Sequence, residues 1–364
     1  MTTPEPPDYR HFDIQGNHTN LGTQLGMADG PFTRQPWWAQ TADLYMTREC
    51  ARVVHDWHPQ LIEEIAAYAD AQQILFDSLW QVSCRVDLKA RLRAQAEDAE
   101  GCSSFAYAIG TSMLVGRNYD YWPLQTRRQR IRFTSVTSAG ASQSRPFASI
   151  GARGGVPCGR YDGMNEHGVF IALHVVMTDS PEPAEIQPGI PFHLVSRIIL
   201  EQSASATAAC DLLLRMPHLS SLNYLVADAH HAFVVEADPR AVRLRPLTTD
   251  LIAAATNHFE HPDMRRFAGR RITENSCRRL DYLLQPCMLP SATRDQTTDG
   301  LLDHAQRILA DRTVPLCGKS GALTTLWACV AELSTRTIRY CAGAPGEAPF
   351  EPCLAPAIID PLTA

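Results

Sequence analysis

The sequence lacks the features by which several large classes of protein are recognised. Its 364 residues contain no apolar run of the roughly 18 residues that a membrane-spanning helix needs. Lys and Arg number 33 against 39 Asp and Glu, so no excess of positive charge indicates a nucleic-acid partner. No two of the 11 cysteines have the two-residue gap of a zinc knuckle or a redox motif. We therefore expect no membrane or nucleic-acid partner, no metal and no cofactor.

The cysteines are numerous, and their number is odd. Cys329 and Cys341 lie in apolar runs, as buried small residues do. A secreted protein rarely leaves so many thiols unorganised, and residues 1–10, acidic and rich in proline, do not resemble a signal peptide. These features favour a cytoplasmic protein. The short arginine run at 127–132 is interpreted as a solvated strand face rather than a phosphate site.

The segment before Gly101 has a helical pattern. Residues 60–75 place Leu61, Ile65 and Tyr68 on one stripe at helical spacing, and His58-Pro59 just before them is a plausible helix start. Residues 20–30 form a second candidate helix. We expect the first hundred residues to be helical.

After Gly101 the pattern changes to short alternating segments separated by turns. Strands are predicted at 103–109, 113–119, 129–138, 168–176, 222–227, 232–237, 251–257, 323–333 and 337–342, and helices at 191–201, 207–215, 276–284 and 301–311. Because strands and helices occur in groups, the order predicts an α+β fold with antiparallel sheets and helices outside them. Residues 344–361, rich in proline, are expected to form an extended surface tail.

Cys102 stands at this change of pattern, after Gly101. A tight turn with a buried thiol would give the same local sequence. If 103–109 and 113–119 pair as a hairpin around Gly110, however, Arg117 and Asp120 return beside Cys102. A cysteine at a new chain terminus carries its own base, the α-amino group, whose ordinary pKa is about 8. A nearby arginine favours the thiolate; the alternative is that Arg117 and Asp120 form a structural ion pair.

Two asparagines stand where an oxyanion donor could lie. Asn165 occupies a turn that leads into a strand, and Asn257 follows the apolar strand candidate at its end. An asparagine just past a strand can offer its side-chain N–H to a developing oxyanion. Either residue could instead be an ordinary turn asparagine.

Taken in order, these segments resemble the penicillin-type acyl-CoA acyltransferases, a family of autoproteolytic cysteine N-terminal-nucleophile (Ntn) hydrolases related to the choloylglycine and penicillin V linear-amide hydrolases. The resemblance extends over nearly the whole chain, through residues 11–26, 59–70, 101–102, 117–120, 162–168, 256–257, 275–279 and 326–340. The spacer from Cys102 to Arg117 is one residue shorter than expected for the bile-salt hydrolases. The hundred residues before Cys102 favour the acyltransferase branch.

The resemblance implies a four-layer αββα sandwich with an N-terminal helical propeptide segment. It implies self-cleavage between Gly101 and Cys102, so that residues 1–101 remain bound as a small chain to a catalytic domain of residues 102–364. It assigns the catalytic site to Cys102, Arg117, Asp120, Asn165, Asn257 and Arg279, although Arg278 could face the site instead. The implied substrate is a small acyl amide or acyl-CoA thioester. The sequence leaves open whether the chain forms a homo-oligomer.

The expected mechanism has an acyl-cysteine intermediate that passes its acyl group to water or to an amine, and the residues do not separate hydrolase from acyltransferase. Two other hypotheses remain. In one, the chain does not cleave and serves as a binding scaffold. In the other, Cys102 works with a separate histidine base such as His174 or His258, two of the 13 histidines.

Overall fold

A computed structural model describes most of the chain. The described residues are 9–29, 44–92, 101–121, 131–138, 146–153, 157–179, 187–268, 274–290, 297–314, 316–317 and 324–353. Most of the arginine run at 127–132 and the end of the expected tail lie outside these ranges. No helix in the described part of the chain is both long enough and apolar enough to span a bilayer.

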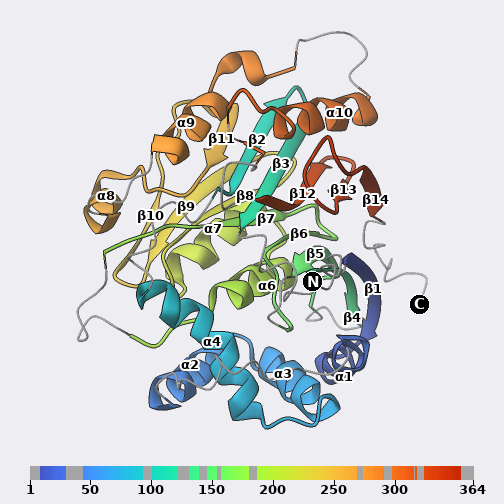
Figure 1. The fold of residues 1–364 in the computed structure, drawn as a ribbon, viewed down its shortest axis with the longest axis vertical. Coiled ribbons are helices and arrows are strands. Elements are labelled where there is room, and N and C mark those ends of the chain that lie inside the picture. Colours follow the sequence, from blue (N-terminus) through green and yellow to red (C-terminus); the bar gives the residue numbers. More distant parts are fainter. Residues whose placement is uncertain are drawn as a thin grey trace, which may run out of the picture.

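Two β-sheets form the centre of the fold (Figure 1). The eight-stranded sheet has the order β1 (Tyr9–Gly16), β4 (Ile131–Ser138), β5 (Ser149–Arg153), β6 (Asp162–Asn165), β7 (Phe170–Val175), β8 (Leu222–Ala227), β9 (Ala232–Asp238) and β10 (Ala241–Leu244). The six-stranded sheet has the order β11 (Ile252–Ala255), β2 (Ser103–Ile109), β3 (Ser112–Tyr121), β12 (Thr324–Glu332), β13 (Thr337–Cys341) and β14 (Phe350–Cys353). Neighbouring strands are antiparallel except β1 and β4, which are parallel.

Helices cover the outer faces of both sheets (Figure 1). The eight-stranded sheet carries α6 (Phe192–Gln202) and α7 (Ala206–Arg215), and the six-stranded sheet carries α9 (Glu274–Leu283) and α10 (Thr298–Leu309). The short α8 (Pro262–Ala268) lies by β10, and the 3-10 helix η3 (Pro286–Met288) follows α9.

Buried apolar clusters bind these layers together. One continuous cluster joins residues of both sheets, such as Val115 and Trp327 with Phe170 and Leu225. A second lies between the six-stranded sheet and α9 and α10. The hydrophobic effect therefore acts both between the sheets and under the helices. This arrangement confirms the predicted four-layer αββα sandwich.

The described residues of the N-terminal segment form four helices, which lie together at one end of the molecule (Figure 1). They are α1 (His18–Asp29), α2 (Leu44–Trp57), α3 (Pro59–Ala71) and α4 (Phe76–Leu92). The prediction that the whole segment is helical was wrong for β1. In that strand Phe12 and Ile14 alternate with polar residues, and Ile14 is buried, so the period is that of a strand. Its eight residues all pair with β4.

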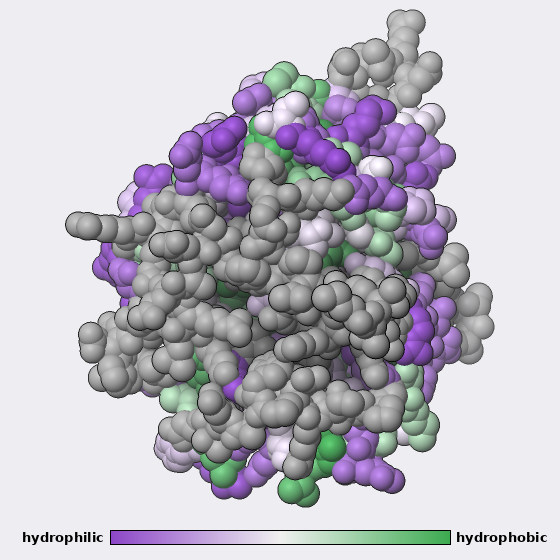
Figure 2. Space-filling model, viewed as in Figure 1, coloured by the Kyte–Doolittle hydropathy of each residue, from purple (hydrophilic) through white to green (hydrophobic). Residues whose placement is uncertain are grey.

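Part of the expected extended tail is a paired strand. Residues 350–353 form β14, which pairs antiparallel with β13 along the edge of the six-stranded sheet. The surface is mixed in character: in Figure 2, apolar residues are scattered among hydrophilic ones where the face is coloured. The most exposed large apolar side chains of the described residues are Met27, Leu75 and Tyr45, all in or beside the N-terminal helices.

Candidate active site

Cys102 lies immediately before β2, a strand flanked by β3 and β11 in the six-stranded sheet. The side chain is buried, with 4% of the residue exposed, and its thiol is 3.7 Å from the carbonyl oxygen of Asp120. β2 pairs with β3 through Ser104 and Arg117, as the hairpin prediction required. β11 pairs with β2 through Ala255 and Ser104, and continuing that register by two residues brings Asn257 beside Cys102.

Gly101 is packed against the carboxylate of Asp120. A Cβ at residue 101 would lie 2.9 Å from Asp120 Oδ2 and 3.2 Å from Asp120 Cβ. The carboxylate cannot move away freely, because Thr325 donates a hydrogen bond of 2.6 Å to its other oxygen. The close approach therefore requires glycine at the predicted junction.

Arg279 holds the backbone on both sides of the junction. Its Nη1 donates to the carbonyl oxygens of Gly101 at 2.9 Å and Cys102 at 2.5 Å, and to Ser103 Oγ at 2.8 Å. Burial lowers the pKa of Arg279, against the opposing charges of Asp120 and Cys102. Arg278, the alternative, is exposed on the same helix, α9. Helix periodicity turns the two neighbours in different directions, so Arg279 is the residue that faces Gly101.

Asn257 is fixed by partners that determine which way its amide points. Arg279 Nη2, which can only donate, lies 3.0 Å from Asn257 Oδ1. The carbonyl oxygen of Val175, which can only accept, lies 2.8 Å from Asn257 Nδ2. The Ser276 hydroxyl accepts the backbone N–H of Asn257 at 2.9 Å. An amide nitrogen carries two hydrogens, so one remains to serve an acceptor beside Cys102.

Arg117 lies on a different face of β3 from Asp120. Residues three apart in a strand point to opposite sides, so the two charged groups do not pair as the alternative interpretation supposed. Arg117 Nε lies 3.0 Å from Asp162 Oδ2, and both side chains are fully buried. Trp327 Nε1 and Tyr340 OH each donate 2.8 Å hydrogen bonds to that same carboxylate. Arg117 shares its sheet face with Ser104 and Cys102.

Both polar atoms of the Asn165 side chain form hydrogen bonds with backbone groups. Its Oδ1 accepts the N–H groups of His167 and Val169, at 3.0 Å each, and its Nδ2 donates to the carbonyls of Leu200 and Ser203 at 3.0 and 2.8 Å. Gly168 completes the turn with φ +78°, a conformation that favours glycine. These bonds fix the turn between β6 and β7 to the end of α6. The geometry therefore gives Asn165 a structural role and leaves Asn257 as the candidate oxyanion donor.

The two candidate histidine bases are engaged elsewhere. His258 Nδ1 is 2.8 Å from Ser276 Oγ, and its Nε2 is 3.1 Å from Glu260. His174 Nδ1 is 3.2 Å from the carbonyl oxygen of Asn223, so Nδ1 carries the proton and Nε2 is an acceptor. Burial, followed by the charge of Arg117, holds the pKa of His174 well below its usual range. A histidine of so low a pKa is a weak base.

Three residues that position the site were given no role from the sequence, although Asp162 and Asn275 lie in segments that carry the family resemblance. Asp162 binds Arg117, Thr325 binds Asp120, and Asn275 accepts a 2.8 Å hydrogen bond from Arg279 Nε. Asn275 lies one residue before the helix predicted at 276–284; the observed α9 begins at Glu274, which places Asn275 one helical turn before Arg279. Asp162 and Thr325 come from strands distant in sequence, and no local pattern joins them to their partners.

Comparison with known proteins gives a family match. A family model described as acyl-coenzyme A:6-aminopenicillanic acid acyl-transferase matches residues 109–347. The acyl-coenzyme A:6-aminopenicillanic-acid-acyltransferase 40 kDa form of Emericella nidulans is 22% identical over 213 residues, which are 58% of this chain and 56% of that protein. The chain thus aligns with little more than half the length of this relative.

Solved structures with a similar arrangement include an N-acylethanolamine-hydrolyzing acid amidase ortholog from Caenorhabditis elegans, with 15% identity and a TM-score of 0.44 over 63% of this chain and 92% of that one. Penicillin V acylase from Agrobacterium tumefaciens also has 15% identity and a TM-score of 0.44, over 66% and 83%. Likeness at this level adds nothing to the assignment.

The family match covers more than half of the chain and confirms the resemblance seen in the motifs. It begins after Cys102, so the assignment of the nucleophile depends on the geometry described above. Arg117, Asp120, Asn257 and Arg279 all lie inside the matched residues. The chain belongs to the acyl-coenzyme A:6-aminopenicillanic acid acyl-transferase family.

Proposed function

We propose that this chain is an autoproteolytic N-terminal-cysteine enzyme that hydrolyses linear amides or transfers acyl groups through an acyl-cysteine intermediate. The observation that carries the proposal is the 2.9 Å hydrogen bond from Arg279 Nη1 to the carbonyl oxygen of Gly101. A buried cationic donor on the carbonyl next to a cysteine stabilises negative charge where attack by that cysteine would create it.

In the self-cleavage step, Cys102 Sγ attacks the carbonyl carbon of Gly101. The oxygen becomes an oxyanion that Arg279 stabilises, the bond to the Cys102 nitrogen breaks, and that nitrogen takes up the proton lost by the thiol to become an amine. The chain is then joined by a thioester, which water hydrolyses to leave Gly101 as a carboxylate. The tight packing of Gly101 against Asp120 limits the movement of the carbonyl and favours a single direction of attack.

In the substrate step, the freed α-amine of Cys102 accepts the thiol proton, and the thiolate attacks the substrate carbonyl. The second Nδ2 hydrogen of Asn257 stabilises the oxyanion, since Val175 and Arg279 hold the rest of its amide. Arg117 shares the sheet face of Cys102 and supplies a fixed positive charge there. The leaving amine or thiol departs with the amine proton, and water or an acceptor amine then takes the acyl group.

Residues 1–101 stay bound after cleavage. β1 remains paired with β4 along its whole length, and buried ion pairs with arginines cross from this segment to the rest of the chain. Asp29 binds Arg153 through contacts of 2.6 and 2.8 Å, and Glu64 binds Arg197 at 3.0 Å. Dissociation would have to separate these ion pairs and the whole β1–β4 strand pairing together.

The family supports a proposal for the substrate class. The relative from Emericella nidulans is named for acyl transfer from acyl-coenzyme A to 6-aminopenicillanic acid. For this chain we propose a small acyl amide or an acyl thioester. Turnover of both kinds of substrate, measured with and without an added amine, separates the reactions: a hydrolase releases free acid at the same rate, whereas an acyltransferase forms a new amide.

The test of the amine base uses residues 102–364, beginning at Cys102 and co-expressed with residues 1–101. We expect activity without any processing step. One residue added before Cys102 converts the amine to an amide, which cannot accept the proton, so turnover should vanish while the thiol still reacts with a small alkylating agent. If the extended protein retains most of its turnover, the base lies elsewhere and the proposal fails.

A further inference from the structure

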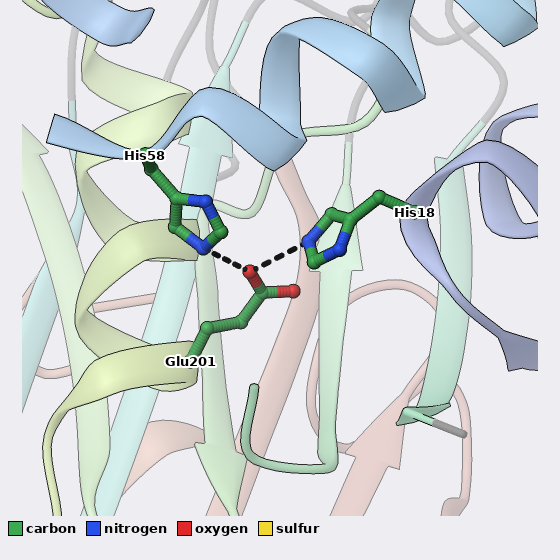
Figure 3. Close-up of side chains that lie close together, drawn as sticks. All are labelled: His18, His58 and Glu201. Carbon is green, nitrogen blue, oxygen red and sulfur yellow. Dashed lines mark hydrogen bonds and ion pairs between the residues drawn. The ribbon is translucent and has the colours of Figure 1, made fainter. Parts of the chain in front are cut away.

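Two histidines and a glutamate converge where α1, α3 and α6 meet (Figure 3). His58 Nε2 lies 2.7 Å and His18 Nε2 lies 3.1 Å from the same oxygen, Oε2 of Glu201. All three ligand atoms lie within 4.8 Å of one another, and each residue is at most 4% exposed. Within the described ranges, no other group of three such side chains converges in this way.

The three residues come from both sides of the Gly101–Cys102 bond. His18 begins α1 and His58 directly precedes α3, whereas Glu201 is near the end of α6. A ligand held by all three would therefore join the N-terminal segment to the catalytic part, whether or not the chain has been cleaved.

The carboxylate is prepared to act as an anionic ligand. Arg197 Nε donates to Glu201 Oε1 at 2.6 Å, which leaves Oε2 directed at the histidines. Although burial opposes ionisation, Arg197 and the two histidines hold the pKa of Glu201 well below its usual range. Arg197 therefore fixes the orientation of Glu201 in the way that outer-shell partners orient metal ligands.

We propose that His18, His58 and Glu201 bind a divalent transition-metal ion of the zinc type, which fastens the N-terminal segment to the catalytic part. Two imidazole nitrogens and one carboxylate oxygen form a known zinc donor set, and ligands at the usual bond lengths around a tetrahedral ion lie about 3.3 Å apart. The observed nitrogen–oxygen distances of 2.7 and 3.1 Å need to open by only tenths of an ångström. Water or Glu64, whose Oε2 is 3.8 Å from His18 Nε2, completes the site.

The surrounding charges are compatible with a dication. Glu64 and Glu201 contact one guanidinium, that of Arg197, so neutral histidines leave one negative charge among these side chains. Arg160 adds a more distant positive charge, and burial lowers its pKa to about 9.

The test is metal binding by the full chain, carrying Cys102→Ala to prevent cleavage and Cys287→Ser to remove an exposed thiol that would bind metals adventitiously. After treatment with a chelator, the protein is titrated with Zn²⁺ by calorimetry and with Co²⁺ by visible absorption. We expect one equivalent of each ion, a tetrahedral Co²⁺ spectrum and a higher melting temperature with Zn²⁺. The readout is binding alone, so it is independent of whether the proposed enzyme activity is correct.

His58→Gln is the decisive variant, since glutamine can still donate an N–H to Glu201 but cannot replace the imidazole as a ligand. We expect affinity to fall by at least about 100-fold. The matched control, His55→Gln, changes an exposed histidine on α2 and should bind as the parent does. If neither ion binds the parent, or if His58→Gln binds equally well, the site is only a hydrogen-bond cluster and the proposal is overturned. If His58→Gln does not fold, His18→Gln is tested in its place, and the parent's stoichiometry and Co²⁺ spectrum decide.

Discussion

Replacing Asn257 by alanine should separate turnover from self-cleavage. The side-chain oxygen is bound to Arg279 and one amide hydrogen to the Val175 carbonyl, which leaves the second hydrogen of a residue that the register of β11 with β2 brings beside Cys102. Loss of one oxyanion donor lowers kcat by about 10²–10³, or about 2.7–4 kcal/mol. Self-cleavage should change little, because Arg279 rather than Asn257 contacts the Gly101 carbonyl oxygen.

A matched control separates the loss of the oxyanion donor from the loss of a hydrogen bond to Arg279. Asn275 also binds that arginine, through a 2.8 Å hydrogen bond from Nε, but no contact joins it to Cys102 or Gly101 among the described residues. Asn275→Ala removes a similar amide and a similar bond, worth about 1 kcal/mol, so we expect at most about a tenfold loss.

The assay measures kcat and KM for any acyl amide or thioester that the parent protein turns over, together with the cleaved fraction on a denaturing gel. Thermal unfolding of both variants shows whether either has lost its fold. If Asn257→Ala and Asn275→Ala lose activity equally, or if Asn257→Ala stays within threefold of the parent, Asn257 is not the oxyanion donor.

Further changes test other parts of the site. Cys102→Ala should remain one chain on a denaturing gel, and Cys102→Ser should cleave slowly through an ester. Gly101→Ala should slow cleavage in a time course, because the new methyl group meets Asp120. Asn165→Ala should lower stability by about 3–4 kcal/mol in denaturant unfolding, for four lost hydrogen bonds, with kcat unchanged below its melting temperature. Burial lowers the pKa of His218 to about 4, so the unfolded chain binds its proton first as the pH falls below 6.5. The free energy of unfolding should therefore fall by up to about 1.4 kcal/mol per pH unit between pH 6.5 and pH 4. His218→Gln should reduce this slope when the free energy of unfolding is measured as a function of pH.

The layers of the fold could be predicted because periodicity reports which face of an element is buried. The strand at 222–227 and the helix at 301–311 were found this way, each with its bounds within a few residues of the structure. β1 was missed because its alternation is short and lies next to a helix start. Its parallel pairing with β4 depends on residues more than a hundred positions away, which no local pattern can indicate.

The candidate site was predictable where it follows from strand register and not where it follows from packing. The hairpin brings Arg117 near Cys102, and the end of β11 brings Asn257 there. The choice of Arg279 over Arg278 needed the position of α9, and the structural role of Asn165 needed the end of α6. Arg117 pairs with Asp162 and not with Asp120. Arg117 and Asp120 are three residues apart in β3, so their side chains point to opposite faces of the sheet.

The mass of the denatured protein tests the central claim most directly. The parent chain, purified in a form that turns over substrate, should give two masses, one for residues 1–101 ending at Gly101 and one for residues 102–364 beginning at Cys102. Before denaturation the two should elute together, held by β1 and the buried ion pairs. A single mass for all 364 residues in an active preparation would contradict the account.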